Sequence, residues 1–300
     1  MISELHTQDS GLVFSMKLLT RRQILQGVMG LPFLSLWPLV VSESKAQPAI
    51  GSREEQRTSI GESFRGEQLD YEMGFWLFKR AVLGKLTFKE LEGKGRYMAT
   101  LQTETLGILG WVARYRVDVY RSTMEEIDGG KRLRSLTFDE EVIIGGKLRR
   151  RSHAFDYQRK KWIVQRLRKD GTLDRTERAI PEGKIYDDFI TAAYNFRYGV
   201  YGPIERGKTY LVPTFPKKGA SSYEIRVAPV EEEERRRKSE KLKDGKELYV
   251  KLLLDPELTH SSEGVVEGWL SKELYPVEGS IKDVMLVGDV TGRLVNRRKT

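Results

Sequence analysis

Cysteine is absent from this 300-residue chain, and histidine occurs only three times. The missing cysteine excludes disulfides, thiolate nucleophiles, iron–sulfur clusters, zinc–thiolate sites and lipid attachment to an N-terminal cysteine. Three histidines supply too few ligands for a multi-histidine metal site. With 39% hydrophobic and 32% charged residues, the chain also differs from disordered, collagen-like and multi-span membrane proteins. We therefore expect a basic globular protein that holds no metal and no cofactor.

Motifs for nucleophilic and phosphate chemistry are missing as well. No Gly-x-Ser-x-Gly elbow exposes a serine, and Gly93-Lys-Gly95 precedes a predicted strand instead of a helix, unlike a phosphate-binding loop. His153 lies on a predicted strand, and His260 lies in a predicted loop beside Ser261. Neither histidine shows the arrangement of a catalytic triad. We predict no catalytic residue and a protein that is not an enzyme.

Paired carboxylates leave one enzymatic alternative open. The candidate groups are Asp187-Asp188, Asp139 to Glu141, and Asp255 with Glu257. Glycoside hydrolysis needs two carboxylates roughly 5–10 Å apart across a cleft. Each group also has a simpler explanation as a helix cap, a solvated strand end or a turn. The alternative hypothesis is an envelope hydrolase acting on glycan or peptide.

The N-terminal residues 1–46 have the three parts of an export signal. A basic head contains Arg21 and Arg22, an apolar stretch follows, and small residues end it at Ala46. The run Arg21-Arg22-Gln-Ile-Leu resembles a twin-arginine motif, although an ordinary secretory signal also starts with basic residues. We predict cleavage after Ala46, with Met16 as an alternative start. An uncleaved membrane anchor is the alternative.

The charge of +9 is consistent with a protein of the cell envelope. A basic surface attracts lipid headgroups, lipopolysaccharide or acidic glycans. Nucleic acid is the other usual partner of a basic chain, but export argues against it. We expect a periplasmic protein, with peripheral membrane contact and envelope protein partners as candidate interactions.

Short strands dominate the pattern after a polar, flexible lead-in at 47–63. Apolar residues occupy every second position from Leu69 to Leu77, as in a half-buried strand. Further short strands separated by Gly and Asp turns predict an antiparallel meander. We expect one β-rich domain over 64–296, with a charged hairpin insertion at 231–246 that is either a solvated extension or a docking spur.

One helix is predicted at about 187–199. Asp187-Asp188 offers an N-cap and a first-turn acid, Phe189 and Phe196 share one face, and Gly199 ends the helix. Its length suits a cover for one face of a curved sheet.

Candidate ligand-binding residues come from the aromatic and basic side chains. Alternation places Lys147, Arg149 and Arg151 on one strand face, which is either a solvated face or a contact for headgroups or glycans. Excess aromatics on a curved sheet either fill the core or line an apolar pocket. The candidates for ligand contact are Phe75, Trp76, Trp111, Phe189, Phe196, Arg149 and Arg151.

Several segments together resemble an exported bacterial family, domain of unknown function 3108. They are Gly61-Glu-Ser-Phe-Arg-Gly-Glu67-Gln-Leu-Asp-Tyr71-Glu-Met, Asp188-Phe-Ile-Thr-Ala-Ala-Tyr-Asn-Phe-Arg197, Gly207-Lys-Thr-Tyr210, Trp269-Leu-Ser271, Pro276-Val277 and a closing hairpin at Gly288–Leu294. The resemblance spans roughly residues 60–296. It implies a mainly β fold, an antiparallel, curved, half-open β-barrel with a helix in its mouth, similar to periplasmic lipoprotein-carrier half-barrels. It supplies no catalytic residues.

Three functions follow from these observations. The leading hypothesis is a non-enzymatic envelope protein that binds a lipidic or amphipathic ligand or assists envelope assembly. The alternatives are the hydrolase and an interaction protein with a filled core. An apolar cavity of several hundred Å³ favours the first.

Overall fold

The computed structural model describes residues 58–75, 78–168, 170–217, 220–240, 245–254, 256–259, 261–284 and 288–300. The chain divides into two units, Met1–Gln47 and Pro48–Thr300, and the described residues all belong to the second. Arg21, Arg22, Ala46 and Trp76, which were singled out in the sequence, lie outside the described residues.

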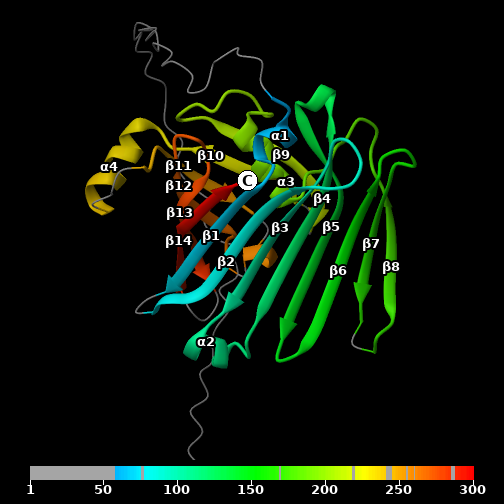
Figure 1. Ribbon diagram of the computed structural model, residues 1–300, viewed down its shortest axis with the longest axis horizontal. Coiled ribbons are helices and arrows are strands. Elements are labelled where there is room, and N and C mark those ends of the chain that lie inside the picture. Colours follow the sequence, from blue (N-terminus) through cyan, green and yellow to red (C-terminus); the bar gives the residue numbers. More distant parts are fainter. Residues whose placement is uncertain are drawn as a thin grey trace, which may run out of the picture. The chain divides into compact units, whose positions relative to one another are not determined.

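A single 14-stranded antiparallel sheet forms the described unit (Figure 1). Its strands are β1 (Glu67–Phe75), β2 (Phe78–Glu90), β3 (Arg96–Thr105), β4 (Val117–Ile127), β5 (Arg132–Ile144), β6 (Lys147–Asp156), β7 (Lys161–Leu167), β8 (Leu173–Ala179), β9 (Thr209–Lys217), β10 (Ala220–Val227), β11 (Leu248–Leu253), β12 (Val265–Leu270), β13 (Pro276–Val284) and β14 (Gly288–Lys299). Strands β1 to β8 follow each other across the sheet and form the first meander. Strands β9 to β14 form the second meander, and the pair β1–β14 joins the two. The predicted antiparallel meander is confirmed.

The sheet curls without closing into a hydrogen-bonded barrel, because β8 and β9 stand at opposite ends of the strand order. Side chains connect the two halves instead. Phe215 of β9 packs at a tilt against Phe155 and Trp162 of the other meander, at ring-centroid distances of 5.5 and 5.3 Å. The prediction of a mainly β, curved and half-open barrel is therefore confirmed.

Helix α3 (Phe189–Tyr198) provides the predicted cover. The Asp188 carboxylate caps it by accepting the N–H groups of Ile190 and Thr191, and Gly199 ends it in the left-handed conformation at φ 86°. Tyr194 packs into the core of the first meander and Phe196 into the core of the second. The helix thus binds both halves of the sheet together.

Three features differ from the sequence predictions. First, part of the lead-in predicted as flexible is ordered, because α1 (Ile60–Phe64) begins within it. The Ser59 side chain caps this helix, and Ile60 is fully buried. Second, Asp187 precedes the cap of α3 and is not a first-turn acid.

The charged insertion is the third correction, because residues 230–240 form helix α4 (Val230–Glu240) and not a hairpin tip. Acidic residues occupy its first turn and basic residues its last turn, which complements the helix dipole. Glu233 anchors it by accepting the N–H of Tyr249 at 3.1 Å and Nε of Arg206 at 2.9 Å.

The remaining helical elements are short. They are α2 (Gly107–Val112), the 3₁₀ turn η1 (Asp128–Gly130) and α5 (Pro256–Thr259). Within the part of the chain that the structure describes, no helix combines the length and apolarity needed to cross a membrane.

Candidate functional site

An apolar pocket of about 300 Å³ lies between α3 and the strands around β1 and β14. Its wall combines Phe196 of α3 with aliphatic side chains of the sheet, namely Met73, Leu101, Ile225, Val250, Leu252, Val266, Leu270, Ile281 and Val290. Such a lining offers a guest almost entirely hydrophobic contact.

The alternation of β1 places its pocket residues on one face. Successive side chains of a strand point to opposite faces, so Glu67, Leu69, Tyr71 and Met73 share the face toward α3. Leu69 is fully buried, and Tyr71 and Met73 line the pocket.

A row of glycines leaves room for the pocket on three neighbouring strands. Gly268 of β12 pairs with Gly279 of β13, Gly279 pairs with Gly292 of β14, and Gly292 pairs with Met73. All three glycines line the pocket. A Cβ atom at Gly292 would lie 3.2 Å from Cγ of Met73. A Cβ atom at Gly268 would lie 2.3 Å from the Glu278 carbonyl oxygen, so glycine at that position also allows β12 and β13 to approach closely.

Two polar side chains of the wall, those of Arg197 and Tyr71, have hydrogen-bond partners. Arg197 donates to both carboxylate oxygens of Glu67, at 2.6 and 2.7 Å, and the two side chains are 6% and 3% exposed. The Tyr71 hydroxyl donates to the Pro276 carbonyl at 3.0 Å. Burial raises the pKa of Tyr71 well above its ordinary value, although Arg197 opposes the shift. The pocket therefore keeps an apolar inner surface beside a neutralised ion pair.

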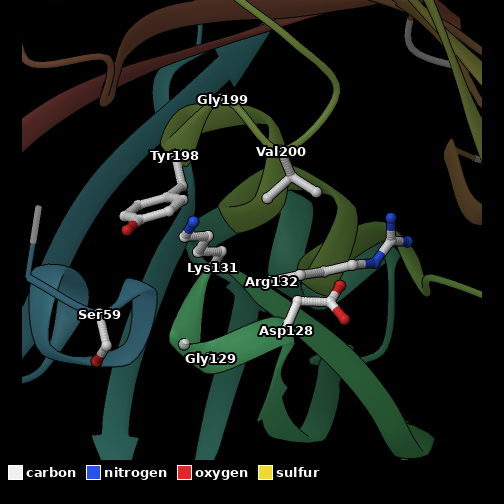
Figure 2. A pocket seen from close by; sticks show the side chains of 9 residues that line it. Ser59, Asp128, Gly129, Lys131, Arg132, Tyr198, Gly199 and Val200 are labelled. Atoms are coloured by element: carbon white, nitrogen blue, oxygen red, sulfur yellow. The ribbon is translucent and has the colours of Figure 1, made fainter. Parts of the chain in front are cut away.

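A second, more polar pocket of about 630 Å³ lies at the C-terminal end of α3. Figure 2 shows Gly199 and Val200 entering it from α3, and Asp128 and Gly129 entering from η1. Asp128 supplies the one carboxylate among its nine lining residues. A glycosidase cleft needs two facing carboxylates, so this pocket lacks that arrangement.

The predicted pair Asp187-Asp188 is fully buried behind this second pocket. One Asp188 oxygen accepts the hydroxyls of Ser122, Ser135 and Thr191 at 2.6, 2.7 and 2.9 Å. The other oxygen caps α3. Asp188 therefore holds the helix start against β4 and β5, as the simpler explanation predicts.

Asp187 makes its own buried contacts. It accepts from Arg132 at 2.8 Å, Tyr201 at 2.6 Å and Asn195 at 3.2 Å. Burial raises the pKa of Asp187 to about 6, even though the Arg132 guanidinium acts in the opposite direction. The carboxylate orients its neighbours and does not face open solvent.

Comparison with known proteins assigns the chain to a family. Residues 70–294 match the model of DUF3108, described as a protein of unknown function. The chain belongs to the DUF3108 family. The chain is also similar to a solved beta-barrel-like protein of domain of unknown function DUF1849 from Brucella abortus, with 12% identity and a TM-score of 0.39, over 79% of this chain and 98% of that one. No curated protein matches.

Two motif segments on which the DUF3108 resemblance rested meet in the structure. Glu67 belongs to the segment 61–73 and Arg197 ends the segment 188–197, and the two residues form the buried ion pair beside the pocket. The motifs therefore describe one structural unit.

The predicted ligand residues do not gather at one place. Phe196 lines the apolar pocket, and Phe189 packs against both cores. Phe75 at the end of β1 packs at a tilt against Phe78 at the start of β2, with the ring centroids 5.4 Å apart. Trp111 lies on α2 and is 72% exposed.

The arginines lie apart from the pocket as well. Arg149 is exposed on β6, and Arg151 faces Glu140 at 3.6 Å. Neither belongs to the pocket lining.

Of the two histidines considered in the sequence, the structure describes His153. His153 is buried among aromatic rings, where Trp162 donates to its Nδ1 at 3.2 Å and Phe215 stacks at 4.7 Å. It has the environment of a core residue. His260 and Asp255 lie outside the described residues.

The pocket residues that sequence reasoning missed are the glycine row and the aliphatic residues opposite it. A glycine inside a strand often marks a close backbone approach or a missing side chain. That signal is present at Gly268, Gly279 and Gly292, each of which lies within a predicted strand.

Proposed function

We propose that this DUF3108 protein is an exported, non-enzymatic envelope protein that binds the acyl part of a lipidic or amphipathic ligand. The observation that carries the proposal is the apolar pocket beside α3, whose polar neighbours Arg197, Glu67 and Tyr71 are already hydrogen-bonded. A hydrocarbon chain needs no polar partner, and burying each methylene contributes about 0.8 kcal/mol.

The size of the pocket favours one acyl chain over a whole lipid. Its volume of about 300 Å³ is near the low end of ligand pockets, which span roughly 300–1,000 Å³. A polar headgroup would then remain outside the apolar wall.

Export is the second part of this proposal. It is supported by the order of a basic head, an apolar stretch and small residues within residues 1–46. A carrier of acyl groups has its substrates in the cell envelope.

The hydrolase alternative has weaker support. Asp187 and Asp188 are fully buried and engaged in hydrogen bonds that fix α3, and the polar pocket contains one carboxylate among its lining residues.

Binding of fluorescent fatty-acyl probes of increasing length tests the proposal. We expect affinity to rise by up to about fourfold per methylene, which corresponds to about 0.8 kcal/mol, and to level off when the pocket is full. Gly292→Val places a side chain in the pocket and should move the plateau to shorter chains. Val295→Leu adds bulk at a 48% exposed position of the same strand and should leave the plateau unchanged.

Native mass spectrometry of protein isolated from its own cells provides a second measurement, with a co-purifying lipid as the expected result. Binding without chain-length dependence in a folded protein contradicts the proposal and favours the interaction protein.

A further inference from the structure

Six large apolar side chains are exposed along one end of the first meander. They are Phe78 (41% exposed), Ile108 (67%), Trp111 (72%), Val112 (65%), Tyr115 (63%) and Leu148 (48%). We call this set the apolar rim. Scattered exposed apolar residues are ordinary, but a contiguous set that includes aromatic residues marks an interaction surface.

The rim residues come from connections that lie at the same end of the sheet. In an antiparallel meander every second connection returns to the same end, so the β1–β2, β3–β4 and β5–β6 connections are neighbours. Backbone hydrogen bonds link them: the Leu106 N–H donates to the Ala81 carbonyl, and the Gly145 N–H donates to the Arg114 carbonyl, both at 2.8 Å. Figure 1 shows α2 projecting at this end of the strands.

Helix α2 presents its apolar side chains outward. Its sequence Gly-Ile-Leu-Gly-Trp-Val contains no charged residue, and Gly110 is its buried position. A helix that only covered the core would instead turn polar residues to water.

The chain adopts an unfavourable backbone conformation to hold this arrangement. Arg114 and Tyr115, which follow α2, have φ values of 58° and 50°. Consecutive left-handed residues other than glycine cost of order 1–3 kcal/mol each, and such strain is concentrated at functional segments.

The three connections that form the rim are also rich in basic residues. The segments 78–80, 106–116 and 143–149 contain six basic residues and no acidic one, namely Lys79, Arg80, Arg114, Arg116, Lys147 and Arg149. Five of these six are exposed. Arg116 pairs with Asp118 at 2.8 Å and Arg80 with Glu72 at 3.1 Å, so four of the six have no ion pair among the described residues. Basic residues near an anionic bilayer contribute about 1 kcal/mol each.

We propose that the apolar rim docks on an anionic lipid bilayer, with Ile108, Trp111 and Val112 entering the headgroup region. Trp and Tyr concentrate at membrane–water interfaces, and apolar side chains flanked by Lys and Arg bind anionic lipid surfaces.

If the protein binds acyl chains, as proposed above, docking of the rim would bring the pocket close to a source of ligand. Met73 lines the pocket and lies two positions before Phe75, where β1 ends at the rim side of the sheet. Docking would therefore bring the rim-side end of the pocket toward the bilayer that supplies the acyl chain.

Vesicle sedimentation tests the docking. The full chain is mixed with vesicles of phosphatidylethanolamine with or without phosphatidylglycerol, at about 0.1 M and about 1 M salt, where the Debye length is about 10 Å and about 3 Å. We expect binding that requires phosphatidylglycerol and weakens at high salt. Because all variants share the same N-terminal residues, differences between them report on the rim.

The variants separate apolar insertion from attraction by charge. Trp111→Ser and the double variant Arg114→Glu/Lys147→Glu should each reduce the vesicle partition coefficient by about tenfold or more. Leu211→Ser removes an equally exposed side chain, 66% exposed on β9, and should change partitioning less than about twofold. An unchanged thermal melt confirms that each variant is folded. Equal losses for Trp111→Ser and Leu211→Ser overturn the proposal.

Light scattering of the same protein variants without vesicles tests whether a second copy of the chain binds the rim instead. A dimer that becomes a monomer on Trp111→Ser, without any loss of vesicle binding, overturns the proposal.

The acyl probe distinguishes failure of the docking from failure of the proposed function. Trp111→Ser should keep probe affinity within about twofold of the unsubstituted protein, and Gly292→Val should keep vesicle binding. Probe binding without vesicle binding overturns the docking alone. Vesicle binding without probe binding overturns the carrier function and supports the docking.

Discussion

Glu67 and Arg197 lie 130 positions apart in the chain and share two hydrogen bonds, at 2.6 and 2.7 Å. Glu67 is the first residue of β1, and Arg197 lies in the last turn of α3. The guanidinium also stacks over the Phe64 ring, 4.6 Å from its centroid. This ion pair attaches the covering helix to the strand that joins the two meanders.

Removing one partner of this pair should destabilise the protein strongly. Arg197→Met leaves the Glu67 carboxylate buried without its counter-charge, which costs about 3–5 kcal/mol of the free energy of unfolding. Urea denaturation measures the loss. The double variant Glu67→Gln/Arg197→Met removes both charges and should recover part of it. If Arg197→Met lowers the free energy of unfolding by less than about 1 kcal/mol, water must solvate the Glu67 carboxylate in place of Arg197.

Phe196 should contribute to both stability and the pocket. It is 5% exposed and packs edge-to-face on Tyr210 at 5.4 Å. Phe196→Ala should therefore cost about 3–5 kcal/mol, measured by thermal and urea unfolding. Phe78→Ala, at a 41% exposed position, is the control and should cost far less. Equal effects of the two substitutions would mean that α3 packs loosely on the sheet.

Much of the fold is predictable from local pattern. Alternating apolar residues and Gly or Asp turns predict the strands, and Asp188 with Gly199 predicts the limits of α3. Four other α-helices of the described residues escape this reasoning; the shortest is α5, with four residues, and the other three are missed for separate reasons. The short α1 lies in a polar segment, α2 has too few residues to show a helical period, and the charges of α4 resemble those of a solvated loop.

The pocket is harder to predict because its walls come from distant parts of the chain. The pairing of β1 with β14 brings Met73 beside Gly292, and no local pattern encodes that pairing. The prominence of aromatic residues in the sequence draws attention to Phe196, which lines the pocket. It also points to Trp111, which the structure places on the rim instead of in the pocket.

The buried carboxylate of Asp187 should give the protein a characteristic dependence on pH. Burial raises its pKa from 3.8 to about 6 in the folded state. The folded protein therefore binds more protons than the unfolded chain between about pH 4 and pH 6. Consequently, the contribution of Asp187 to the free energy of unfolding falls as pH rises through this window, by on the order of 2–3 kcal/mol.

Urea unfolding at several pH values tests this effect. The Asp187→Asn variant should lack this decline in the free energy of unfolding. The difference in the free energy of unfolding between the variant and the unsubstituted protein should therefore change with pH. Glu182→Gln, which removes an 88% exposed carboxylate, should leave the pH profile as it is. A pH-independent difference for Asp187→Asn contradicts a raised pKa.

The N-terminal residues provide the test of export. Twin-arginine transport depends on both arginines of its motif, so replacing Arg21 and Arg22 by lysine should retain the protein in the cytoplasm if that route is used. Arg149→Lys/Arg150→Lys, the same change on β6, is the matched control and should be exported normally. Export that survives the change at Arg21 and Arg22 would indicate the general secretory route.

N-terminal sequencing of the exported protein should give a chain that starts near Gln47, because the small residues that end at Ala46 form the predicted cleavage site. Recovery from membranes of a chain with an intact Met1 or Met16 terminus would contradict cleavage and establish the N-terminal segment as an anchor.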